Sequence, residues 1–156
     1  IFNPDGARLP HDNKVYFYSR SSNHDNKQFH KVYYEYQYVH QKHPDSELWL
    51  AGRFSPENIP NNFDFFYGEK VNWFGYITDP EAMATYLRSA DYFYYPFSFD
   101  ACSNSLIEGL MCDCQPIVLD DSGGAREILV KWEKFGVDYF KLNRMKREYE
   151  EVFNGF

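Results

Sequence analysis

The sequence predicts an α/β domain built on a doubly wound parallel sheet of five or six strands. Residues 91–96 form a short aromatic run that ends at a proline, and residues 115–119 form a short apolar run. Between them, apolar side chains recur at helical spacing, at Leu106, Ile107, Leu110 and Met111. Strand, polar loop, helix and strand in this order make a βαβ unit. A chain of 156 residues is long enough for one domain with a substantial core.

The loop that enters the helix of this unit is a candidate phosphate-binding site. Ligands of α/β sheets bind at the carboxyl ends of the strands, which is where the loop lies. We expect the helix to begin between Ser103 and Ser105, and its first amides lack partners and carry partial positive charge. A diphosphate suits these amides, and Ser103, Asn104 and Ser105 add hydrogen-bonding side chains.

Two carboxylates flank this loop. Glu108 lies about one turn into the expected helix, where it could accept hydrogen bonds from vicinal hydroxyls such as those of a ribose. Asp100, on the loop, would face the group attached beyond the phosphates. A structural alternative stays open, because Ser105-x-x-Glu108 also matches a capping box and Asp100 could stabilise the loop or the helix N-terminus.

The segment resembles the E-x7-E region of retaining GT-B glycosyltransferases of the group 1, family 4 type. Pro96, Asp100, Glu108 and the Pro-Ile-Val run at 116–118 carry the resemblance. Other landmarks follow the family in the same order, from about residue 15 to residue 129. They look like three strands, the helix end before the fourth strand and a Gly-x-x-Glu turn, at residues 15–20, 47–52, 71–75, 89–91 and 123–127.

The resemblance implies a Rossmann-like domain, one half of a GT-B fold, that binds the donor of a sugar transfer. Such enzymes move a sugar from an NDP-sugar to an acceptor and keep the anomeric configuration. By resemblance, Asp100 is the catalytic residue that contacts the donor sugar, and Glu108 holds the ribose. The other donor-binding residues would be Arg20, Lys27, Tyr76, Ser103, Asn104 and Ser105. Of these, Arg20 and Lys27 would clamp the diphosphate and stabilise the leaving group, and Tyr76 would border the base. No metal and no cofactor are implied.

Several positions depart from the family pattern. Asp100 replaces the usual glutamate, Ser19 stands where the first strand normally ends in glycine, and Lys27 lies farther beyond Arg20 than is common. A catalytically inactive nucleotide-sugar-binding or scaffold domain of the same fold is therefore an alternative. An epimerase or a phosphorylase with a similar half-domain is another.

The chain is too short for both domains of a GT-B enzyme. Residues 1–14 are turn-rich and polar, as expected for a linker from a missing N-terminal domain that would supply the acceptor site. Residues 15–156 would form the nucleotide-sugar-binding domain, ending in a charged helix over residues 143–153 with the family's last helices truncated. We expect the isolated chain to be inactive.

The composition of the chain excludes some classes of binding partner. A net charge of -7 argues against nucleic acid and anionic membranes, and no apolar run reaches transmembrane length. Three cysteines leave an odd thiol and indicate a reducing, cytoplasmic compartment. Cys102, Cys112 and Cys114 could be imagined as a metal site, but buried structural thiols are the better interpretation.

Tyrosines cluster on a helix expected over residues 26–43. Tyr33, Tyr34, Tyr36 and Tyr38 could form a carbohydrate or partner surface, but we favour half core and half ordinary surface. The five histidines have no spacing typical of catalysis or of metal ligation. We expect polar surface roles for His11, His24, His30, His40 and His43.

Overall fold

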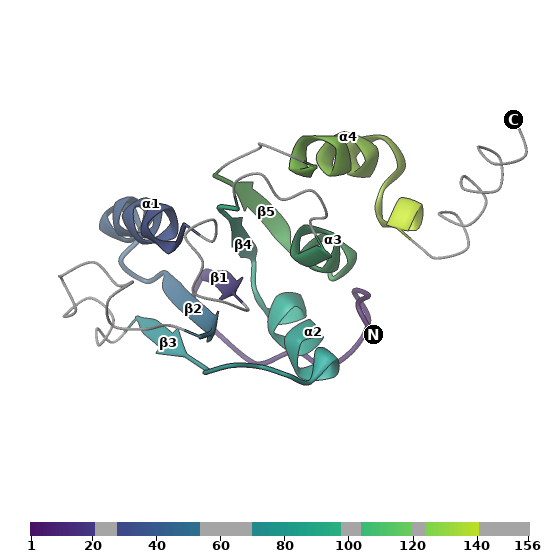
Figure 1. Cartoon of the computed structure of the whole chain (residues 1–156). Coiled ribbons are helices and arrows are strands. Elements are labelled where there is room, and N and C mark those ends of the chain that lie inside the picture. Colours follow the sequence, from purple (N-terminus) through teal and green to yellow (C-terminus); the bar gives the residue numbers. More distant parts are fainter. Residues whose placement is uncertain (21–27, 54–69, 98–103, 120–123, 141–156) are drawn as a thin grey trace, which may run out of the picture.

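Five parallel strands form one sheet in the order β3-β2-β1-β4-β5 (Figure 1). This computed structural model describes residues 1–20, 28–53, 70–97, 104–119 and 124–140, apart from the side chain of Arg20. The strands are β1 (Val15–Arg20), β2 (Glu47–Gly52), β3 (Val71–Trp73), β4 (Tyr92–Tyr95) and β5 (Gln115–Val118). The strand β3 ends at Trp73, two residues before the predicted end, although Phe74 still donates a backbone hydrogen bond to Leu50 and Gly75 accepts one from Gly52.

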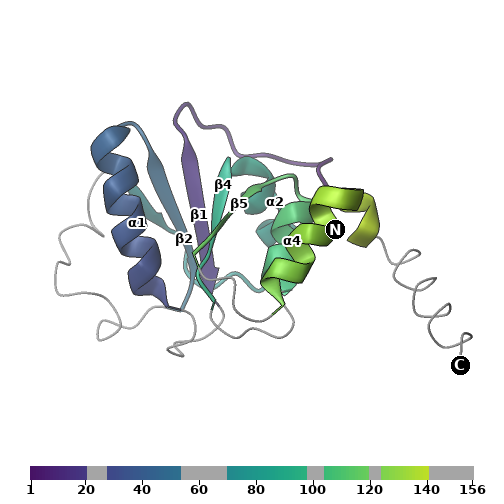
Figure 2. The same cartoon turned by 90° about the horizontal axis from the view of Figure 1, so that it is seen from above.

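Helices cover both faces of the sheet. In the described residues they are α1 (Phe29–Lys42), α2 (Pro80–Ser89), α3 (Asn104–Met111) and α4 (Ala125–Phe135), followed by the 3-10 turn η4 (Val137–Phe140). Figure 2 shows α1 on one side of the strands and α2 and α4 on the other. The predicted doubly wound α/β fold is therefore confirmed. The predicted C-terminal helix at 143–153 lies outside the described residues.

The alternation of side chains along β1 divides the core into two halves. Tyr16 faces α1, where its ring lies 6.0 Å from that of Tyr36, centroid to centroid. Phe17 faces the opposite side, with its ring parallel to that of Tyr86 on α2 at 6.2 Å. Both halves are thus lined by aromatic rings, which accounts for much of the unusual aromatic content.

The α1 tyrosines divide as predicted between core and surface. Tyr33 and Tyr36 are buried, whereas Tyr34 and Tyr38 are exposed. Tyr36 also donates a hydrogen bond to the carbonyl oxygen of Ser46 at 2.8 Å. Its burial, which outweighs that hydrogen bond, raises the pKa of its phenol to about 12.

Cys112 and Cys114 are free, buried thiols, which confirms the structural interpretation for these two positions. Burial raises the pKa of the Cys112 thiol to about 11, and it raises the pKa of Cys114 as well. Burial thus favours the protonated form of both thiols. Cys102 lies outside the described residues.

The N-terminal segment packs on the last turn of α2 through a buried arginine. Arg88 is 1% exposed, and its guanidinium donates to the carbonyl oxygens of Ala7 at 3.1 Å and Ile1 at 3.2 Å. It also donates to Glu81 Oε1 at 2.6 Å, which supplies the opposite charge. Gly6 lies against the guanidinium so closely that an added Cβ would come within 2.8 Å of Arg88 Cζ. Residues 1–9 are thereby bound to the domain, while their role as a linker stays a prediction.

The same segment holds a histidine that the sequence placed on the polar surface. His11 is instead half-buried, and its ring lies edge-on to Trp49 with centroids 5.7 Å apart. Its Nε2 lies 2.5 Å from the carbonyl oxygen of Ser89, and its Nδ1 lies 2.8 Å from that of Asn13. The expectation was wrong here because residues 7–11 run along the end of α2 rather than away from it.

The described helices are all shorter or more polar than a membrane span requires.

We predict that Arg88→Met lowers the free energy of unfolding by about 2–4 kcal/mol, because several charge-assisted hydrogen bonds are lost at a buried position. Urea denaturation followed by circular dichroism measures the change. Trypsin should also cleave after Arg8 faster in this variant, because the N-terminal segment is released. Arg126→Met is the matched control, since Arg126 is exposed on α4. Equal stability of the two variants would contradict the role of Arg88.

A second prediction concerns Tyr94, a buried tyrosine on β4 whose hydroxyl has no hydrogen-bond partner in the described part of the chain. Tyr94→Phe should leave the free energy of unfolding unchanged or raise it by up to about 1 kcal/mol, because an unsatisfied polar group is removed. Tyr36→Phe should lower it by about 1–2 kcal/mol, because the bond to Ser46 is lost. The two variants remove the same atom, so urea denaturation of both compares them directly. A Tyr94→Phe variant as unstable as Tyr36→Phe would show that the Tyr94 hydroxyl is paired.

Candidate functional site

A pocket lies between β1 and β4, where the order of the strands in the sheet reverses. After β1 the chain adds β2 and then β3 on one side of β1. It then adds β4 on the other side of β1, and β5 beyond β4. The helices that follow β1 and β4, α1 and α3, lie on opposite faces, so a crevice opens between the carboxyl ends of these two strands. The pocket has an empty volume of about 280 Å³, open solvent at its mouth included. Its lining residues are Phe17, Ser19, Leu87, Phe93, Tyr94, Phe97, Ser105 and Glu108.

Helix α3 brings two of the predicted residues to this pocket. It is held close against β4 at Gly109, where an added Cβ would lie 2.5 Å from the ring of Phe93. A larger residue at this position would push the helix away from the strand. Because α3 is fixed in this way, Ser105 in its first turn and Glu108 one turn later both line the pocket.

The structure does not support the capping-box alternative for these two residues. A capping box needs its serine at the residue before the helix, but α3 begins at Asn104, so Ser105 is already inside the first turn. In the described part of the chain, the side chains of Ser105 and Glu108 form no hydrogen bond with each other or with another group. Their hydrogen-bonding capacity is available to the pocket.

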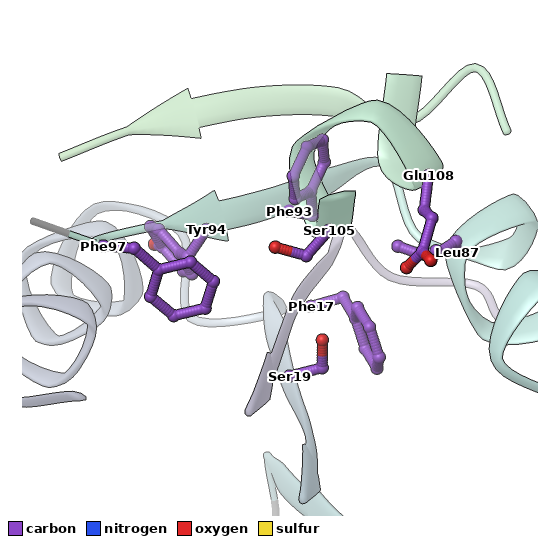
Figure 3. Close-up of a pocket in the computed structure, with 8 residues that line it drawn as sticks. All are labelled: Phe17, Ser19, Leu87, Phe93, Tyr94, Phe97, Ser105 and Glu108. Atoms are coloured by element: carbon purple, nitrogen blue, oxygen red, sulfur yellow. The ribbon is translucent and has the colours of Figure 1, made fainter. Parts of the chain in front are cut away.

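Glu108 is a half-buried carboxyl with apolar neighbours. Figure 3 shows its carboxyl group beside Leu87, with Phe17 close by. Burial raises the pKa of the Glu108 carboxyl, and among the described residues no charged group counteracts the effect. An ionised carboxylate in such a place lacks donors, and hydroxyl groups of a ligand would supply them.

Ser19, for which the sequence indicated no role, lies on the opposite wall. It follows Phe17 by two residues on β1, and so projects from the same face of the sheet. In Figure 3 its hydroxyl points toward Ser105 across the pocket. Period-two alternation from the apolar Phe17 is the signal that could have identified it.

Tyr76 follows β3 at the same edge of the sheet but does not line this pocket. Its ring is 47% exposed, and the guanidinium of Arg53 lies over it at 4.6 Å from the ring centroid. A backbone hydrogen bond of 2.7 Å from Gly52 to Gly75 holds the ends of β2 and β3 together next to this pair. Arg53 is a second residue at this edge that sequence reasoning missed.

The remaining predicted site residues are only partly placed. Asn104 is the exposed first residue of α3. Arg20 ends β1, in register with Gly52 of β2, but its side chain lies outside the described part of the structure. Lys27, Asp100 and Ser103 also lie outside the described residues. The structure thus brings Ser105 and Glu108 together and leaves the grouping of the others as a prediction.

Several solved structures are similar to the chain in fold. A crystal structure of TarM matches with a TM-score of 0.60 at 13% identity, covering 85% of this chain and 30% of that one. An S. aureus TarM mutant in complex with fondaparinux, alpha-GlcNAc-glycerol and UDP also matches at 0.60 and 13%, covering 80% and 25%. This chain thus spans less than a third of the length of TarM in these two structures.

A third structure resembles the chain over nearly all of both lengths. It is the C-terminal domain of LpcC from Francisella tularensis, a glycosyl transferase group 1 family protein, with a TM-score of 0.60 and 12% identity. The match covers 92% of this chain and 88% of that domain. A comparison with curated protein sequences finds no match.

A family model, described as glycosyl transferases group 1, matches residues 12–139. The match includes every described strand and helix, together with the pocket between β1 and β4. The chain therefore belongs to the group 1 glycosyl transferases.

Proposed function

We propose that the chain is the nucleotide-sugar-binding domain of a retaining glycosyltransferase, which transfers a sugar from an NDP-sugar to an acceptor. The observation that carries the proposal is the pocket at the reversal point of the sheet, with Ser105 and Glu108 directed into it.

In this proposal the donor binds along the carboxyl edge of the sheet. Glu108 accepts hydrogen bonds from the two ribose hydroxyls, and the first turn of α3, with Asn104 and Ser105, holds the diphosphate. Tyr76, with Arg53 against its ring, borders the base. UDP is the first nucleotide to test, because a structure of TarM holds it.

The chemistry is assigned to residues outside the described part of the structure. Asp100 contacts the donor sugar, while Arg20, Lys27 and Ser103 stabilise the negative charge that builds on the leaving diphosphate. We propose that no metal ion and no cofactor takes part. A preceding N-terminal domain would supply the acceptor site, so the isolated chain would bind the donor without transferring its sugar. The free thiols of Cys112 and Cys114 are consistent with a cytoplasmic protein.

Glu108→Gln tests the ribose contact. We predict that it weakens UDP binding about 10- to 100-fold, because a charged acceptor is lost. Isothermal titration calorimetry on this chain measures the affinity. Deoxygenated UDP lacking the 2′-hydroxyl provides the control ligand: wild type should discriminate against it, and the variant should not. If wild type and variant discriminate equally between UDP and the deoxygenated ligand, Glu108 does not contact the ribose.

The same substitution should not lower stability at neutral pH. Burial raises the pKa of Glu108 in the folded chain, so its protonated form contributes fully to the free energy of unfolding below the ordinary glutamate pKa. That contribution is lost as the pH rises through the pKa of the folded chain. Glutamine is uncharged at every pH and does not lose it. Glu108→Gln should therefore unfold at the same temperature as wild type or higher at pH 7, with the difference shrinking on acidification. A lower melting temperature at pH 7 would instead indicate a structural role.

Asp100→Asn in the full-length protein separates an active enzyme from an inactive binding or scaffold domain. If Asp100 is catalytic, sugar transfer should fall by about 100-fold or more, while UDP affinity changes little. Release of UDP from a panel of UDP-sugars with acceptor measures transfer. Wild-type protein that binds UDP but transfers no sugar would favour the inactive alternative.

A further inference from the structure

We propose that Ser19 is a further donor-binding residue, whose hydroxyl donates a hydrogen bond to a diphosphate oxygen from the wall opposite Ser105. This inference rests on the proposed function. It adds a side chain from β1 to a diphosphate site otherwise assigned, in the described residues, to α3.

The position of Ser19 follows from the pairing of β1. The strand pairs with β2 on one side and with β4 on the other, so its backbone is held between two neighbours. Side chains alternate along it, and Tyr16 and Tyr18 project toward α1. Ser19 therefore projects with Phe17 toward the face of α2 and α3, where both line the pocket.

The hydroxyl of Ser19 is free to bind a ligand. The side chain is half-buried, and it shares the pocket lining with the apolar rings of Phe17, Phe93 and Phe97 and with the polar groups of Tyr94, Ser105 and Glu108. In the described part of the chain no hydrogen bond engages its Oγ. A hydroxyl carries one donor and two acceptor sites, and a ligand in the pocket can engage them.

The helix end that faces Ser19 across the pocket indicates which ligand group its hydroxyl would bind. Its hydroxyl points toward Ser105, and Ser105 lies in the first turn of α3. The amides of a first helical turn favour anionic oxygens. A diphosphate held by those amides would thus lie between the two serines. The Ser19 hydroxyl points toward that position and would donate a hydrogen bond to an anionic oxygen there. Glycine or alanine at position 19 would leave that side of the diphosphate to water.

Ser19→Ala and Ser19→Gly test the inference. Calorimetry with UDP and an NMR titration with uridine, both on this chain, separate the phosphate contact from the nucleoside contacts. We expect each variant to bind UDP about 5- to 20-fold more weakly and uridine as wild type does. Tyr34→Phe is the control, since it removes an exposed hydroxyl on α1. Thermal denaturation should show all three variants folded.

The results distinguish this inference from the proposed function. If wild type binds UDP and the Ser19 variants bind it equally well, the role of Ser19 is overturned and the donor site stands. If the variants lose affinity for UDP and uridine alike, Ser19 shapes the pocket and does not contact the phosphates. If wild type binds none of UDP, GDP and ADP, the proposed function fails, and the inference fails with it.

Discussion

The site depends on the reversal of strand order between β1 and β4. Both strands are parallel and paired at Tyr16 and Phe17, so their carboxyl ends reach the same edge together. Helix α1 follows β1 on one face of the sheet, and α3 follows β4 and packs against α2 on the other face. The two helices therefore lie on opposite sides of the strand ends, which leaves a crevice between β1 and β4. The pocket lies in this crevice, and the side chains of the site line it.

The chemistry of the pocket follows from the side chains that line it. Its walls are largely aromatic, and the polar side chains Ser19, Ser105 and Glu108 project into it. Unpaired polar groups in such surroundings are unfavourable for the fold, and the raised pKa of Glu108 reflects that cost. A ligand that supplies hydroxyl donors and anionic oxygens offsets it. The same groups that weaken the empty domain can therefore favour a bound nucleotide.

The amino edge of the sheet, opposite the pocket, stabilises the domain. There Arg88 binds the carbonyl oxygens of the N-terminal segment, and Glu47 accepts hydrogen bonds from Asn13 and Trp49. Partial burial would raise the pKa of Glu47, but these hydrogen bonds and the charges of Lys70 and His11 lower it overall. Polar groups are thus paired at the amino edge, whereas the side chains of Ser19, Ser105 and Glu108 at the carboxyl edge have no hydrogen-bond partner among the described residues. The division lets the binding site remain polar and open while the other edge holds the domain together.

The sequence by itself determined the βαβ unit of β4, α3 and β5, and with it the positions of Ser105 and Glu108. These are local features, since helical spacing and strand composition act over a few residues. Only the tertiary structure decided that Ser19 and Leu87 line the same pocket, and that Arg88 is buried beneath the N-terminal segment. These contacts join elements far apart in the chain, through strand pairing and helix packing. Local pattern does not encode which distant residues meet, because register and packing are set by the whole core.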